Sequence, residues 1–147
     1  MKISTRVRYG VRLMLSLALN YGKGPVFLKN IAEEEEISQK YLSLIILPLK
    51  GKGLVHSTRG AHGGYALGKH PEQITLKEIV DILEGDTCLV DCVKYPARCT
   101  RAPLCASRDL WTILGEKISE TLGSMTLARL AEMKRERIEK ASFNYAV

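Results

Sequence analysis

The fold is decided by residues 28–67, whose sequence is LKNIAEEEEISQKYLSLIILPLKGKGLVHSTRGAHGGYAL. Residues 28–33 predict a short helix. A second helix is predicted to begin at Ser38, because a serine hydroxyl there can accept a hydrogen bond from an amide of the first turn. Two short helices joined by a tight turn form a helix-turn-helix. Pro48 lies inside the second helix and removes one backbone donor, so this helix is predicted to kink or end near Leu47.

The rest of this stretch predicts a β-hairpin. Residues 53–58 have the composition of a strand, residues 59–64 form a glycine-rich tip, and residues 65–67 form the returning strand. A hairpin directly after a helix-turn-helix has the place of a wing. The glycines match neither a phosphate-binding loop nor a dinucleotide fingerprint, and they join two strands instead of leading into a helix, so a nucleotide site is not favoured.

The chain before this stretch predicts another helix. Apolar residues recur at helical spacing from Val7 to Leu19, and the pattern stops at Gly22-Lys23-Gly24-Pro25. The predicted helix therefore runs from Ser4 to Tyr21 and forms one wall of a core.

A capping box predicts a further helix after the hairpin. The Thr75 hydroxyl is expected to accept from a first-turn amide while the Glu78 carboxylate reaches back to the cap. This helix is predicted to run from Leu76 to about Leu83, and Gly85 ends it.

Charge is distributed unevenly along the chain. Residues 1–70 hold 11 Lys and Arg against 4 Asp and Glu, whereas residues 71–147 hold 11 against 12, within a net charge of +6. A basic half favours a polyanion partner, because basic side chains gain free energy by displacing counterions condensed on phosphates. Double-stranded DNA is the expected partner. Lipid headgroups are the weaker alternative, because no strongly basic amphipathic helix is evident.

The candidate DNA contacts lie mainly on the outer, amino-terminal surface of the second helix of the helix-turn-helix. Lysine and glutamine offer hydrogen bonds to phosphates or bases, and a helix amino terminus favours phosphate through its free N–H groups. An arginine at the hairpin tip is suited to the minor groove. An ordinary solvated helix face is the alternative interpretation. The candidates are Ser38, Gln39, Lys40, Ser43, Arg59, His62, Lys2 and Arg6.

Four cysteines, Cys88, Cys92, Cys99 and Cys105, fall within eighteen positions, and the chain has none elsewhere. Clustered thiolates in a chain without a secretory signal hold a metal or sense redox state more often than they form structural disulfides. Residues 86–103 show no helical or strand period. The closely spaced cysteine pairs that are typical of zinc-binding motifs do not occur. Widely spaced thiolates on an irregular loop can instead bind an iron-sulfur cluster.

A long helix is predicted after Cys105, with Ser107 and Asp109 as capping residues. Thr126 is predicted to cap a last, highly charged helix that ends near Lys140. An apolar stripe on the long helix suits a partner helix, although packing against the core is the alternative. The stripe consists of Trp111, Leu114, Ile118, Leu122 and Met125.

A set of short motifs extends along nearly the whole chain. It consists of Ile31-Ala32, Ile37-Ser38, Tyr41-Leu42, Gly53-Leu54-Val55, Arg59-Gly60-Ala61-His62-Gly63-Gly64-Tyr65, Thr75-Leu76-Lys77-Glu78-Ile79-Val80, Leu110-Trp111 and Thr126-Leu127. Together these motifs resemble the winged-helix regulators of the IscR/NsrR (Rrf-type) family. The resemblance implies a transcription regulator that represses from a palindromic operator. It also implies a homodimer joined by the long helix, with two recognition helices about 34 Å apart, and cluster ligation by Cys92, Cys99 and Cys105.

The chain departs from this family at the fourth ligand of the cluster. In the IscR type a histidine three residues beyond the last cysteine completes a 2Fe-2S site, and Arg108 stands there in this chain. A guanidinium group offers no lone pair suited to iron. In the NsrR type an aspartate of the partner subunit serves a 4Fe-4S cluster, and the matching position is Arg8. Cys88 is then the first candidate for the fourth ligand, and Asp91 or a residue of the partner subunit is the next. A small buried apolar role for Cys88 is the alternative.

The expected fold is mainly α-helical with a small β wing. It comprises a winged helix-turn-helix domain over residues 1–85, a cluster loop over residues 86–105, and a dimerisation helix with a C-terminal helix over residues 106–147. The expected function is operator binding controlled by an iron-sulfur cluster, 2Fe-2S or 4Fe-4S, that senses redox state, nitric oxide or iron and sulfur supply. The main alternative is a cluster-free thiol switch or zinc site in a regulator of sulfur metabolism.

Other classes of protein are not favoured by the sequence. No catalytic motif stands out, so an enzyme is not expected and no catalytic residue is predicted. No apolar stretch is long enough for a signal peptide or a membrane span, so the protein is expected in the cytoplasm and away from membranes.

Overall fold

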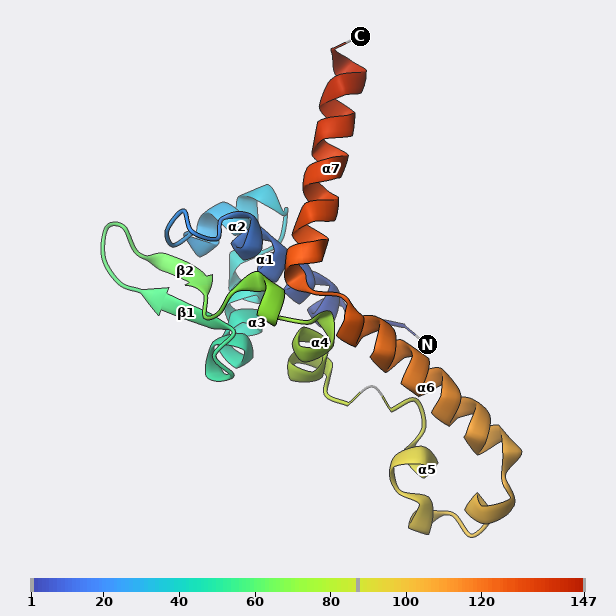
Figure 1. Ribbon diagram of the computed structural model, residues 1–147. Helices are drawn as coiled ribbons and strands as arrows, with labels where there is room; N and C mark the ends of the chain where they lie inside the picture. The colour runs from blue at the N-terminus through green and yellow to red at the C-terminus, as the bar shows by residue number, and fades with distance from the viewer. Residues whose placement is uncertain (1, 87, 147) are drawn as a thin grey trace.

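A computed structural model describes residues 2–86 and 88–146. It is mainly helical with one small antiparallel sheet, which confirms the expected fold class (Figure 1). The elements are α1 (Thr5–Leu19), α2 (Leu28–Glu34), α3 (Gln39–Gly51), β1 (Val55–Thr58), β2 (Gly64–Leu67), α4 (Leu76–Glu84), α5 (Asp91–Lys94), α6 (Ala106–Ser124) and α7 (Leu127–Tyr145), with single 3-10 turns at Pro71–Gln73, Pro96–Arg98 and Ala102–Leu104.

The predicted caps set the starts of α1 and α3. The Ser4 hydroxyl accepts from the Val7 amide at 3.2 Å, and α1 begins at the next residue. The Ser38 hydroxyl accepts from the Tyr41 amide at 3.4 Å, so α3 begins where the sequence predicts. Between α2 and α3 the chain turns through Glu36 at φ 53°, a left-handed conformation that is uncommon for a residue other than glycine.

The sequence predicts that α3 kinks or ends near Leu47. It does not end there but continues through Pro48 to Gly51. A proline removes only the single N–H that would bond four residues back. Because Pro48 lies near the end of the helix, one bond is lost and the last turn still forms. Leu49, beyond the proline, is fully buried and holds that turn against the core.

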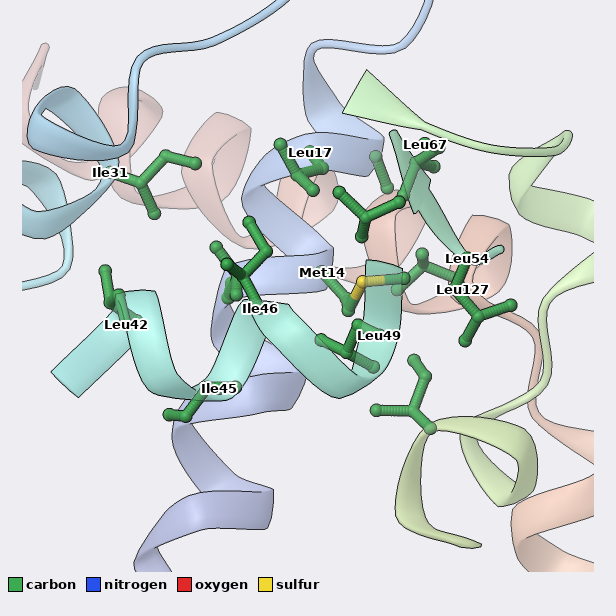
Figure 2. Close-up of a cluster of buried hydrophobic side chains, with 14 of the residues drawn as sticks. Met14, Leu17, Ile31, Leu42, Ile45, Ile46, Leu49, Leu54, Leu67 and Leu127 are labelled. Carbon is green, nitrogen blue, oxygen red and sulfur yellow. The ribbon is translucent and has the colours of Figure 1, made fainter. Parts of the chain in front are cut away.

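The core lies where α1, α3, α4 and the first turns of α7 meet the base of the hairpin (Figure 2). Helices α1 and α4 approach closely at Gly10, where a Cβ atom would lie 2.1 Å from a methyl of Leu83. The fully buried large side chains are Leu13, Met14, Leu17, Ile31, Leu42, Ile45, Ile46, Leu49, Leu54, Ile74, Ile79 and Leu127.

The hairpin forms as predicted, with β1 and β2 in antiparallel register from Val55 opposite Leu67 to Thr58 opposite Gly64. Its base is tied to the chain before α2, because Val26 and Tyr65 exchange two backbone hydrogen bonds at 2.8 Å. At Gly64 φ is 135°, and a Cβ atom would lie 2.5 Å from the Val26 carbonyl oxygen. Only glycine fits this position.

Half of the predicted capping box forms at α4. The Thr75 hydroxyl accepts from the Glu78 amide at 3.2 Å. The Glu78 carboxylate does not reach back to the cap but accepts from Lys69 Nζ at 2.8 Å. Lys69 lies just after the hairpin and offers the carboxylate a charged partner, and charge-assisted hydrogen bonds are stronger than neutral ones.

The ends of the last two helices differ from the predictions. Helix α6 begins at Ala106, with Cys105 at its N-cap and no side-chain cap, so Ser107 and Asp109 lie inside its first turn. The Thr126 hydroxyl caps α7 as predicted, by accepting from the Arg129 amide at 3.1 Å. Helix α7 continues past the predicted end to Tyr145.

Helices α6 and α7 leave the domain in different directions (Figure 1). Their junction is joined to the start of α4 by a small antiparallel bridge, in which the Leu76 amide donates to the Met125 carbonyl at 2.9 Å and the Leu127 amide donates to the Ile74 carbonyl at 2.8 Å. Every residue of α6 is at least partly exposed. Among the described residues, no helix is long and apolar enough to cross a bilayer.

Candidate DNA-binding face and cysteine segment

The predicted contacts at the start of α3 differ in what their side chains already bind. Ser38 uses its hydroxyl as the helix cap, and the Ser43 hydroxyl donates to the Gln39 carbonyl at 2.9 Å. The Gln39 and Lys40 side chains are exposed and make no hydrogen bond within residues 2–86 and 88–146. Gln39 and Lys40 are therefore the residues of this set whose donors are available to an outside partner.

The hairpin presents the other predicted contacts of this region. Arg59 and His62 are both exposed at its tip. The hairpin is connected to α3, because Lys50 Nζ donates to the Ser57 hydroxyl at 2.6 Å and the Leu54 amide donates to the Leu49 carbonyl at 3.0 Å. Helix α3 and the hairpin therefore form one connected unit.

Lys2 and Arg6 lie apart from this unit. Both are exposed, but Lys2 precedes α1 and Arg6 lies in its first turn, and the N-terminus and the hairpin lie on opposite sides of the view in Figure 1. The structure does not bring them together with Arg59 and His62.

The charge of this region is more uneven than the halves of the chain indicate. Residues 37–71 contain five Lys and Arg and all three histidines, and no Asp or Glu. Lys69 is paired with Glu78, but the other four basic side chains make no ion pair within residues 2–86 and 88–146. Unpaired charges of one sign raise the local concentration of a partner of opposite charge. The positive charge of the amino-terminal half is therefore concentrated in residues 37–71.

Two leucines on α3 are exposed, which the sequence did not predict. Leu44 is 57% exposed and Leu47 is 62% exposed, although an apolar residue on a helix is first assigned to the core. Leu44 and Leu47 lie four and seven residues after Lys40, and this helical spacing would have placed them on the same outward face of α3 as Lys40.

An ion network that the sequence did not predict joins the turn of the helix-turn-helix to α7. Glu35, which is 8% exposed, accepts from Arg12 Nε at 2.8 Å and from Lys134 Nζ at 3.1 Å. Burial alone would raise the pKa of Glu35, but the hydrogen bonds from Arg12 and Lys134 outweigh it and the pKa is lowered. Helices α1 and α7 are thus both tied to the turn before α3.

The cysteine segment, residues 86–105, is a chain of short turns at the far end of α6 (Figure 1). All four cysteines are free thiols and half-buried. Across residues 2–86 and 88–146, no three His, Cys, Asp or Glu side chains are gathered closely enough to hold a metal ion. The donor chemistry fits an iron-sulfur cluster, since thiolates are its usual ligands, but this arrangement does not.

Local hydrogen bonds hold the start of the segment. The Cys88 amide donates to the Asp86 carboxylate at 2.6 Å, and the Cys88 thiol donates to the Val90 carbonyl at 3.2 Å. Lys94 pairs with Asp86 at 2.9 Å across the α5 turn. The predicted ligand Cys88 therefore directs its thiol to its own backbone in this structure.

Arg108 attaches the segment to α6. Its Nε donates to the Cys92 carbonyl oxygen at 3.1 Å. Beside this contact, Cys88, Val93 and Trp111 contribute to a cavity of about 280 Å³ between the segment and α6. Trp111, predicted to lie on a partner-facing stripe, thus faces the cysteine segment.

Cys105 is chemically distinct among the four thiols. Its Sγ lies 3.3 Å from the Ser107 hydroxyl. That hydrogen bond, followed by one from the Arg108 backbone amide, lowers the pKa of the Cys105 thiol. A lower pKa favours the thiolate, which is the form that binds metals and attacks oxidants.

Comparisons with known proteins agree over nearly the whole chain. The family described as "Rrf2: Iron-dependent Transcriptional regulator" matches residues 3–133. The transcriptional regulator CymR of Bacillus subtilis is 42% identical over 131 residues, which are 89% of this chain and 90% of that protein. The regulator IscR of Erwinia tasmaniensis is 36% identical over 132 residues, which are 88% of this chain and 78% of that protein.

Solved structures show the same fold. The structure of CymR, described as the global cysteine regulator of B. subtilis, superposes with a TM-score of 0.77 at 40% identity and covers 90% of this chain and 98% of that one. IscR of T. potens gives a TM-score of 0.78 at 36% identity, and the match covers 93% of this chain and 90% of that one. With the match over residues 3–133, these likenesses show that the chain belongs to the Rrf2 family of transcriptional regulators.

Proposed function

We propose that this chain is a homodimeric, cytoplasmic repressor that binds a palindromic operator and whose cysteine segment controls that binding through an iron-sulfur cluster, 2Fe-2S or 4Fe-4S. The observation that carries the proposal is the position of all four cysteines on one segment attached to α6, outside the core of the winged domain. Redox state, nitric oxide or iron and sulfur supply are the proposed signals. The family membership supports the DNA-binding part.

The proposed DNA contacts divide by chemistry. Gln39 and Lys40 would reach base edges or phosphates from the start of α3, while Arg59 and His62 would contact the backbone or the minor groove from the wing. Ser38 and Ser43 would contribute backbone amides and hydroxyl lone pairs near the same helix end. Lys2 and Arg6 would meet DNA only where it bends around the domain.

Helix α6 is the proposed dimer interface. Leu110 is 55% exposed and Ile113 is 57% exposed on this helix. Exposed apolar side chains on a projecting helix suit a second copy of the same helix related by two-fold symmetry. Two winged domains joined in this way would present their recognition helices to successive turns of the operator.

The contacts of the segment provide a route to the DNA-binding half. Arg108 ties the Cys92 backbone to α6, and the backbone bridge between Thr75 and Thr126 ties the end of α6 to α4. A change in the fold of the cysteine segment would therefore act on α6, and through its junction on the winged domain. Cluster ligation itself requires a rearrangement of the segment that brings the thiols together.

Purification without oxygen tests the proposal directly. Protein that is coloured and holds iron and sulfide in matched amounts would establish the cluster, with Cys92→Ala expected to lose it. Cys92→Ala should also leave operator binding independent of redox and iron conditions. Unchanged regulation of operator binding in this variant would overturn the sensing part.

Arg108→His sharpens this test, because it places an imidazole where IscR-type proteins carry a histidine ligand. If the wild-type chain uses Cys88 as the fourth ligand, Cys88→Ala should lose the cluster and the Cys88→Ala/Arg108→His double variant should regain it. Recovery would be read from iron content and visible absorption. A cluster that Cys88→Ala leaves intact would assign the fourth ligand elsewhere.

A second candidate function is a thiol switch or zinc site on the same scaffold, acting in sulfur metabolism. The thiol switch is supported by the lowered pKa of Cys105, because the thiolate is the form that reacts with oxidants. CymR is described as a global cysteine regulator, and the CymR of Staphylococcus aureus has been solved in an oxidized form. Colourless protein after attempted cluster reconstitution, with bound zinc or oxidant-dependent DNA binding, would favour this function.

A further inference from the structure

We infer that Leu44 and Leu47 read thymine methyl groups in the major groove of the operator. The inference rests on the proposed DNA binding and adds to it the residues that select A·T base pairs. Both side chains are more than half exposed, at 57% and 62%, in a helix whose other apolar residues are buried or half-buried.

The two leucines lie on the outward face of α3. Lys40, Leu44 and Leu47 are spaced by four and three residues, which places them on one side of a helix. The opposite side carries the fully buried residues of this helix, labelled in Figure 2 as Leu42, Ile45, Ile46 and Leu49. The leucines therefore continue the surface that begins with Lys40 and is presented to the same partner.

The charges around the leucines indicate a nucleic acid as that partner. Lys40 precedes them, and Lys50 and Lys52 follow them on the same helix and its cap. Residues 37–71 include no carboxylate that could pair with a basic protein surface. Within the major groove of DNA, the apolar feature of a base edge is the C5-methyl group of thymine.

Leucine at these positions would favour A·T over G·C base pairs in two ways. It gains free energy by covering a thymine methyl, in proportion to the apolar area removed from water. Opposite a G·C pair, the same side chain would cover polar base atoms without offering them a hydrogen bond, which is unfavourable. The two residues are about 4.5 Å apart along the helix axis, close to the roughly 3.4 Å rise of a base pair, so they suit neighbouring thymines.

Replacing thymine by deoxyuridine tests the inference, because it removes only the methyl group. An operator is first selected from a random duplex library with the full chain, and each of its thymines is then replaced singly. For the wild-type chain we expect the Kd to rise about fourfold at each methyl that a leucine covers. Leu44→Ala should abolish the effect at one position, and Leu47→Ala at another.

Two control variants separate this effect from general changes. Leu104→Ala removes a side chain that is 95% exposed in the cysteine segment and should keep both uracil effects. Lys40→Ala should weaken binding to every duplex while keeping them. Far-UV circular dichroism and thermal melting should match the wild type for both α3 variants, because their side chains are exposed.

The outcomes separate the inference from the function it rests on. A selection that enriches no sequence would overturn the proposed operator binding itself. An enriched operator whose affinity does not respond to uracil, or responds equally in the alanine variants, would overturn the methyl readout alone. A change in oligomeric mass of Leu44→Ala, together with equal uracil responses, would assign the leucines to a protein interface instead.

Discussion

The winged domain and the cysteine segment with α6 are built on opposite principles. In the winged domain, one continuous core is drawn from helices α1 to α4, the start of α7 and the hairpin. In α6 no residue is fully buried, and the segment is held mainly by single hydrogen bonds such as that from Arg108 to Cys92. A well-packed domain and a loosely held segment would suit the proposed function, in which the cysteine segment changes shape while the DNA-binding face does not.

The same substitution in each region should give the largest contrast. Leu49→Ala removes a fully buried side chain from the core, and we expect the free energy of unfolding to fall by about 2–5 kcal/mol. Leu104→Ala, at a residue 95% exposed, should change it by less than about 0.5 kcal/mol. Denaturant unfolding followed by circular dichroism measures both, and similar losses would show that the segment has a core of its own.

The Glu35 network should matter less than the core but more than a surface pair. Glu35→Gln leaves Arg12 and Lys134 without their carboxylate, and we expect a loss of about 1–3 kcal/mol. The matched control is Glu33→Gln in the last turn of α2, two residues before Glu35, because its carboxylate is exposed and lies 3.8 Å from Lys29. That control should lose less than about 1 kcal/mol.

The effect of Glu35 should depend on pH in a defined direction. Its pKa is lowered by folding, so its contribution is complete above the usual glutamate value of 4.5 and is lost as the pH falls through the folded value. The difference in unfolding free energy between wild type and Glu35→Gln should therefore shrink below about pH 4.5. A difference that grows in acid would mean that the pKa is raised.

Arg108→Ala should loosen the cysteine segment with little effect on the winged domain. The variant loses the hydrogen bond to the Cys92 carbonyl, and such a bond contributes about 0.5–1.5 kcal/mol. We expect faster amide exchange in residues 88–105, altered fluorescence of Trp111 and unchanged exchange in α3. Arg101→Ala, an exposed arginine of the same segment, is the control and should leave exchange unchanged.

Ser107→Ala should give the smallest effect, confined to one thiol. In metal-free protein the variant loses the hydroxyl that lies 3.3 Å from Cys105 Sγ, so the pKa of Cys105 should rise. Alkylation of Cys105 at neutral pH should slow, while alkylation of Cys99 stays the same, as mass spectrometry of timed digests would show. Equal alkylation rates in variant and wild type would mean that the helix amide sets the pKa alone.

Local patterns predicted the winged domain well because its elements are set by neighbouring residues. Ser38 caps α3 within its own first turn, so the start of this helix could be read from the sequence. The partner of Glu78 could not, because Lys69 reaches it only after the hairpin folds back. The end of α3 was also missed, since burial of Leu49 outweighs one lost hydrogen bond at Pro48.

The candidate contact residues divide along the same line. Gln39 and Lys40 could be proposed from the sequence because polar residues at a helix start remain exposed, whereas the exposure of the apolar Leu44 is visible only in the fold. Glu35 lies within a run of four glutamates, and only the tertiary fold shows that Arg12 and Lys134 converge on it. Spacing identified the cysteines as a group, but their relative positions depend on the fold of the segment around them.

The bridge between Thr75 and Thr126 gives α6 the mechanics of a lever. Helix α6 has 19 residues and is therefore about 28 Å long, with the bridge at one end and the cysteine segment at the other. A shift of about 1 Å at the cysteine end then corresponds to a rotation of about 2° at the bridge. The cysteine end lies farthest from the bridge, so a small force there would act with a large moment on the two backbone hydrogen bonds of the bridge and on the packing of α6 against α4.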